Sequence, residues 1–163
     1  PADHPARYAL CEVVNLHDPA LEFEPIYRLA FGCDTGALIA GFRDPAERLC
    51  GCEAAQTFRI VTAEGEETVT VRHPEKTLSV ATLQDYLDSY AAAHPLELDY
   101  IHGESTVVSL AAAPGKVGFL FDGMRKNELF RAVERSGALP RKTFSMGHAA
   151  DKRFYLECRR IDG

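Results

Sequence analysis

The residues of this sequence that are best suited to chemistry are a short run of cations and hydroxyls. Arg141, Lys142, Thr143 and Ser145 place two cations and two hydroxyl donors within five residues. Arginine can hold an oxyanion with two parallel hydrogen bonds, and lysine adds a point charge. The segment therefore predicts a site for a phosphate or carboxylate. The alternative is a surface loop whose polar groups bond to its own backbone.

Two further residues are predicted to line the same anion site. Arg28 is the only charge in the apolar run 26–31, and if buried it needs a partner, either a carboxylate of this chain or a ligand. His102 precedes Gly103 between a predicted strand and a predicted helix, a junction where α/β proteins often bind ligands. A purely structural histidine in a turn is the alternative reading.

The cysteines and the absence of other motifs argue against a metal or a cofactor. The five cysteines are Cys11, Cys33, Cys50, Cys52 and Cys158. Only one residue separates Cys50 from Cys52, and no second pair stands at zinc-ligand spacing, so we expect no metal. Neither a phosphate-binding glycine loop nor a nucleophile elbow occurs, and we expect no cofactor. An odd number of cysteines favours reduced thiols and a cytoplasmic location.

The charge of the chain is unevenly distributed. The net charge is −6, but residues 124–163 carry 10 basic and 5 acidic side chains. These are either solvated faces or a basic rim for a phosphate or an acidic partner. Aromatic residues do not alternate with the basic ones, which argues against a nucleic-acid partner. With no leader and no apolar run of membrane-spanning length, the sequence also argues against a membrane partner.

Apolar periodicity predicts the elements that would position these residues. Strands are expected over residues 8–14, 21–24, 26–31, 98–101, 117–121 and 154–158, and a β-hairpin over 57–62 and 67–72. Helices are expected over 79–93, with Ser79 as N-cap, over 105–113, and over 126–135, with Gly137 as C-terminal cap and Leu129, Phe130 and Val133 inward. Two short helical pieces, 37–42 and 46–52, would be broken at Gly41, Pro45 and Gly51.

These elements predict the fold class. We expect an α/β or α+β fold, in which helices pack on a mixed sheet of about six strands that includes one hairpin. The chain has 163 residues, a length that suits a single domain over residues 1–163. We expect this domain to be the C-terminal portion of a longer protein.

Several spaced blocks resemble a bacterial and archaeal family called domain of unknown function ten-fifteen, whose members are sometimes labelled ParB-like. The blocks lie at residues 15–28, 100–103, 117–120, 139–143 and 152–157. The resemblance implies an upstream segment with an Asp-Gly-x-His motif, which this chain does not contain. It also implies His where this sequence has Tyr27, a substitution that favours a structural or binding role for that position.

Three functions remain open at this point. The first is a partner or substrate-binding domain without catalysis, which completes a nucleotide- or phosphate-handling segment upstream in the same protein. The second is part of a phosphotransferase site, because positioning and charge stabilisation are the main requirements of phosphoryl transfer. The third is a protein-interaction module with a basic C-terminal face. The expected partners are the upstream domain and a phosphate-bearing small molecule.

Overall fold

The computed structural model describes residues 4, 7–9, 11, 13–48, 55–72 and 74–148. In chain order the elements are β1 (Phe23–Phe31), α1 (Thr35–Arg48), β2 (Gln56–Thr62), β3 (Gly65–Val71), α2 (Ser79–Ala93), β4 (Glu97–His102), α3 (Glu104–Ala111), β5 (Lys116–Phe121), the 3-10 helix η2 (Lys126–Glu128), α4 (Leu129–Ser136) and β6 (Phe144–Met146).

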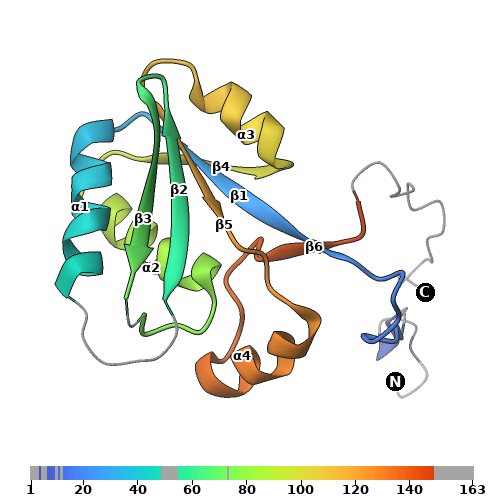
Figure 1. Ribbon diagram of the computed structural model, residues 1–163. Helices are drawn as coiled ribbons and strands as arrows, with labels where there is room; N and C mark the ends of the chain where they lie inside the picture. Colours follow the sequence, from blue (N-terminus) through green and yellow to red (C-terminus); the bar gives the residue numbers. More distant parts are fainter. Residues whose placement is uncertain are drawn as a thin grey trace.

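A six-stranded sheet forms the centre of the molecule (Figure 1). Five strands follow the order β3-β2-β5-β1-β4, and β6 pairs with the first residues of β1. All five pairings among the described residues are antiparallel. The predicted fold class, six strands with packed helices and one hairpin, is confirmed, although the sheet that was expected to be mixed is antiparallel in all of these pairings.

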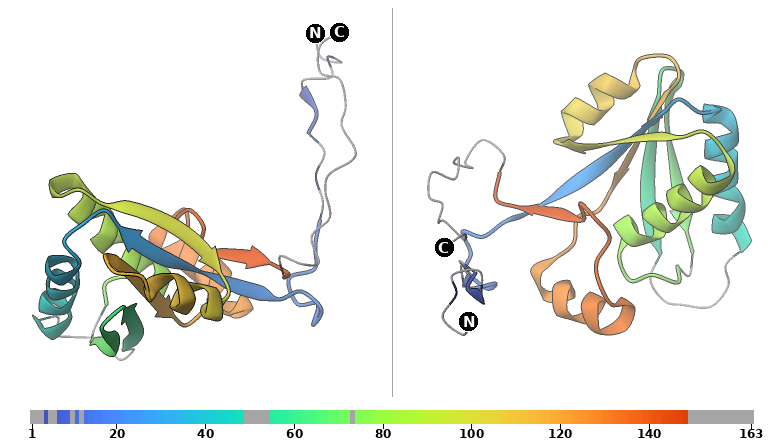
Figure 2. Two further views of the ribbon diagram at one scale, coloured as in Figure 1. Left: turned by 90° about the horizontal axis from the view of Figure 1, so that it is seen from above. Right: turned by 180° about the vertical axis from the view of Figure 1, so that it is seen from behind.

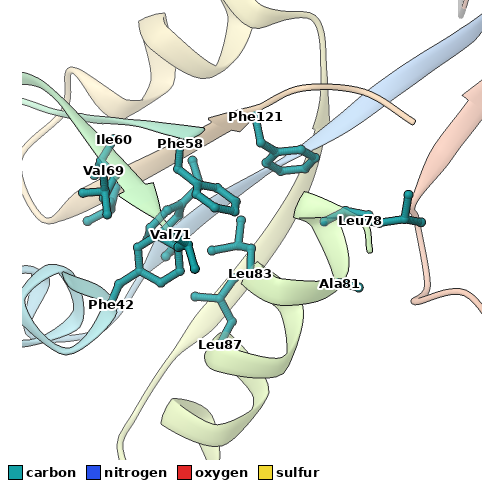
Figure 3. Packing of buried hydrophobic residues seen from close by; sticks show 14 of the residues in the cluster. Phe42, Phe58, Ile60, Val69, Val71, Leu78, Ala81, Leu83, Leu87 and Phe121 are labelled. Carbon is teal, nitrogen blue, oxygen red and sulfur yellow. The ribbon is translucent and has the colours of Figure 1, made fainter. Parts of the chain in front are cut away.

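Alternate residues of the strands face different helices, as the two-residue period of a strand requires. Ala30, Phe58 and Phe119 belong to the larger core cluster, to which α1 and α2 contribute. Figure 3 shows Leu83 and Leu87 of α2 and Phe42 of α1 in the same cluster as Phe58. The neighbouring strand residues, such as Leu29, Val61 and Leu120, pack instead with α3.

Helices α3 and α4 lie at opposite ends of the molecule in Figure 1 and in the right-hand view of Figure 2. α3 lies close to the sheet because Gly118 has no side chain. A Cβ at Gly118 would stand 2.7 Å from Cγ1 of Val107. Among the described residues, no helix is both long and apolar enough to cross a membrane.

Most of the elements predicted from residue 57 onward are present. The hairpin of β2 and β3 turns at residues 63–64. α2 ends before His94, as predicted, although its N-cap is Leu78 and not Ser79. The strand predicted at 98–101 is β4, the one at 117–121 is β5, and the helix predicted at 105–113 is α3. Gly137 is the C-cap of α4, with a φ of 75°.

Three predictions in the first half of the chain were wrong. The described part of segment 8–14 forms no strand, and Val13 is 97% exposed there. β1 continues through Pro25, which lies opposite Phe144 of β6. α1 runs unbroken through Gly41, where a Cβ would stand 2.7 Å from the Tyr86 hydroxyl, so this glycine permits close approach of α1 and α2.

The inward face of the helix predicted at 126–135 was also partly wrong. A short 3-10 turn precedes α4. The buried residue of α4 is Ala132. Phe130 is 65% exposed and Val133 44% exposed, while Leu129 packs against the core. The strand predicted at 154–158 and the Cys50–Cys52 pair lie outside the described residues.

Candidate functional site

The Arg28 guanidinium is fully buried and donates to backbone and amide oxygens. Its Nε donates to Gln84 Oε1 at 2.9 Å, and its Nη1 donates to the Ile26 carbonyl at 2.6 Å. Nη1 and Nη2 also donate to the carbonyls of Lys142 (3.1 Å) and Arg141 (3.2 Å). The sequence left a carboxylate or a ligand as partner, and the structure provides neutral oxygens instead.

The backbone of Lys142 explains how two successive carbonyls reach one guanidinium. Lys142 has a φ of 55°, the one positive φ outside glycine among the described residues. Helical conformations of either hand point successive carbonyls the same way, whereas an extended residue points them apart. The left-handed conformation costs roughly 1–2 kcal/mol in a residue other than glycine. The bonds to Arg28 offset that cost.

Burial and stacking also act on Arg28. Tyr100 lies opposite Arg28 in the register of β1 and β4. Its ring centroid is 4.5 Å from the Arg28 Cζ and 5.5 Å from the Arg141 Cζ. Burial lowers the pKa of Arg28 to about 10, because the charged form loses hydration there. Arg28 therefore remains protonated at neutral pH.

The two hydroxyls of the predicted anion site are buried and have partners within the chain. The Thr143 hydroxyl donates to the Pro140 carbonyl at 2.6 Å. The Ser145 hydroxyl lies 3.5 Å from the Gly147 carbonyl, which accepts from it. Each side chain is only 6% exposed. Both therefore shape the segment that leads into β6.

The predicted histidine faces a carboxylate. His102 Nδ1 lies 3.4 Å from Glu24 Oε2. His148, just after β6, lies 2.8 Å from Glu22 Oε2 through its Nε2. These contacts link β4 and the end of β6 to the beginning of β1.

The structure thus brings Arg28 together with the 141–142 segment, but through backbone carbonyls. Arg141 and Lys142 are themselves exposed, and His102 is paired with Glu24. Ligand binding at the six predicted residues stays a prediction. The donors of Arg28 and Thr143 already have partners, so any ligand there would have to displace internal hydrogen bonds.

A cavity of about 510 Å³ lies elsewhere, at the beginning of α2. Its walls come from the first residue of β2, the loop before α2, the segment after β5 and the end of α4. The residues that matter below are Gln56, Lys76, Ser79, Val80, Asp122, Arg125 and Arg135. The volume is in the usual range for small-molecule sites, about 300–1,000 Å³.

The N-terminus of α2 is uncapped at this cavity. Leu78 occupies the N-cap and offers no side-chain oxygen to the helix. The N–H groups of Ser79 and Val80 lie in the first turn, where an α-helix has no internal acceptors for them. Such a terminus carries partial positive charge and attracts anions.

Charges of both signs surround this terminus. Arg125 and Arg135 are exposed, and neither pairs with a carboxylate of the described residues. Lys76 lies 3.1 Å from Asp85. The carboxylates of the cavity wall are Glu75, Asp122 and Glu128. Of these, Glu128 already accepts the Arg125 backbone N–H at 2.7 Å. The cavity thus offers two guanidinium groups that form no ion pair with a described carboxylate, beside hydrogen-bond acceptors.

Gln56 is the buried polar residue of the cavity wall. It is 7% exposed, and its Nε2 donates to the Lys76 carbonyl at 2.8 Å. Its Oε1 is buried and has no hydrogen-bond partner in the described part of the chain. A buried oxygen without a donor costs about 1–3 kcal/mol. This atom calls for an explanation.

A second cavity, of about 390 Å³, adjoins the first and reaches the predicted anion site. Lys76 and Ser136 line both cavities, and Arg141 lines the second. Of the six residues predicted to bind an anion, Arg141 is the one that lines this second cavity.

No group of three or more potential metal-ligating side chains occurs among the described residues. Cys11 and Cys33 are free thiols, and burial raises the pKa of Cys33. No family model, curated protein or solved structure matches the chain.

Sequence reasoning missed the residues of the first cavity. Two local signals pointed there: Lys76 stands three residues before a helix, and Arg125 follows the predicted strand 117–121 and its Asp122-Gly123 turn. Both positions flank element ends that can meet in an α/β layout. The pairing of β2 with β5, which brings Gln56 to this end of the sheet, could not be deduced from local pattern.

Proposed function

We propose that this chain is a binding domain that holds a phosphate- or carboxylate-bearing small molecule for a reactive segment elsewhere in the same protein. The observation that carries the proposal is the cavity in which Arg125 and Arg135 accompany the uncapped N-terminus of α2. Guanidinium groups that donate two parallel hydrogen bonds, and N–H groups of the first turn of a helix, are donors that proteins commonly offer to phosphate. The cytoplasmic location expected from the cysteines, and the resemblance to a ParB-like family with an upstream segment, support the same reading.

The proposal predicts weak but localised phosphate binding by the full chain. Because the proposed reactive segment would supply the rest of the pocket, we expect weak binding by this chain. The Kd should be near 1 mM, a binding free energy of about −4 kcal/mol. Titration with inorganic phosphate should shift the NMR amide signals of Ser79 and Val80. Each of Arg125→Gln and Arg135→Gln should weaken binding roughly fivefold, because each removes about 1 kcal/mol of charge interaction.

Arg131→Gln is the matched control, since Arg131 is an exposed arginine of α4 that does not line the cavity. It should leave phosphate binding unchanged. Shifts confined to His102 and the 141–145 amides would favour the site predicted from sequence. If the amide signals of Ser79 and Val80 do not shift at a high concentration of phosphate, the proposal is wrong.

Asp122 favours a second candidate, in which the cavity is part of a phosphotransferase site. Its carboxylate follows β5 and lines the same cavity as the cations. A carboxylate in that position could accept the proton of a substrate hydroxyl during phosphoryl transfer. If so, the protein with magnesium should hydrolyse ATP slowly to ADP and phosphate, with water as the acceptor in place of the substrate hydroxyl, and this rate should fall at least a hundredfold in Asp122→Asn while phosphate binding persists. A binding domain would show no ADP release in either form.

A further inference from the structure

The Gln56 side chain identifies a second requirement of the ligand, and this inference rests on the function proposed above. The bond from Nε2 to the Lys76 carbonyl fixes the orientation of the amide. A flipped amide would place two oxygens against each other. The atom left over is therefore the acceptor, Oε1, with its lone pairs unused.

Gln56 is also held in place by the sheet. It is the first residue of β2 and lies opposite Val71 of β3. The Lys76 carbonyl that it binds stands two residues before Leu78, the N-cap of α2. One short loop thus connects the unpaired acceptor to the helix terminus that attracts the anion. Gln56 also lines the cavity, so the unpaired acceptor belongs to a residue that borders the space for a ligand.

Two further side chains of the cavity wall are also hydrogen-bond acceptors. Glu75 and Asp122 are exposed carboxylates of the cavity, and carboxylates accept hydrogen bonds but do not donate them. A ligand with only an anionic group would satisfy Arg125, Arg135 and the helix terminus, and it would leave every one of these acceptors unused.

We propose that the ligand of this cavity is a phosphomonoester whose organic part carries a hydroxyl or amino donor, and that Gln56 Oε1 receives that donor. The phosphate lies at the first turn of α2 between the two arginines. The donor-bearing part lies toward Gln56 at the beginning of β2. An alkyl phosphate fills the first half of this arrangement and leaves the second half unsatisfied.

The test compares three ligands with the full chain: glycerol 3-phosphate, ethanolamine phosphate and n-propyl phosphate. The donor-bearing compounds should bind about 5 to 10 times more tightly than n-propyl phosphate, the effect of one satisfied buried acceptor. In Gln56→Met, which keeps the length of the side chain without its oxygen, this preference should disappear. Ser79→Ala leaves the acceptor in place and should retain the preference.

The outcomes separate the two proposals. If all three ligands bind equally to the wild-type protein and shift Ser79 and Val80, the role of Gln56 is wrong and the anion site stands. A preference that survives in Gln56→Met also overturns the role of Gln56. If none of the three binds, the proposed function fails as well. Should Gln56→Met not fold, the wild-type comparison alone decides whether a donor is recognised.

Discussion

Replacing Arg28 with methionine is expected to lower the free energy of unfolding by about 3–5 kcal/mol. Methionine has a similar length but no donors. The substitution would leave Gln84 Oε1 and the carbonyls of Ile26, Arg141 and Lys142 without the N–H groups that they now receive. Urea denaturation followed by circular dichroism measures the change, with the slope m showing whether unfolding remains two-state.

Arg141→Met is the matched control for this experiment. Arg141 lies over the same Tyr100 ring, but its side chain is exposed. Exposed charge interactions of this kind contribute at most about 1 kcal/mol. Equal stability of the two variants would show that the hydrogen bonds of the buried Arg28 guanidinium contribute little to the stability of the fold.

The second large effect is expected for Phe58→Ala. Phe58 is fully buried, and its ring meets Phe42 edge to face at a centroid distance of 5.1 Å. Removing a core phenylalanine costs about 3–5 kcal/mol, through lost burial and the cavity left behind. Thermal and urea denaturation of the variant should both show this loss (Figure 3 shows the packing).

Phe130→Ala provides the control, because it removes the same ring from a 65% exposed position on α4. Its stability should stay within about 0.5 kcal/mol of the wild type. A large loss at Phe130 would support the sequence-based prediction that this residue faces inward, against the structure.

Local patterns predicted the elements that local chemistry determines. The β-rich run 67–72, joined by a short turn to the run 57–62, predicted β3, and the spacing of Leu83 and Leu87 predicted α2. Patterns failed where a distant contact decides. Gly41 was interpreted as a helix break, but it is the point where the Tyr86 hydroxyl approaches α1 and donates to the Leu38 carbonyl at 2.6 Å.

In the candidate site, too, local pattern predicted some features, while distant contacts decided the others. A lone arginine in an apolar run predicted that Arg28 needs a partner, and that was confirmed. The identity of the partners depends on Lys142, 114 residues later, whose backbone conformation no propensity scale predicts. The cavity at α2 combines residues from β2, a loop and α4. Each of them alone has the appearance of an ordinary polar surface residue.

The place of β1 in the sheet has a consequence for how the chain folds. β1 is the first strand of the described residues, yet it lies between β5 and β4, and its earliest residues pair with β6. Loops of many residues must close before any of these contacts forms, and such topologies fold slowly. The hairpin of β2 and β3 needs no such closure and can form first. During synthesis on a ribosome, β1 would therefore remain without a partner strand until β4 has emerged, and its second neighbour in the sheet, β5, would follow later.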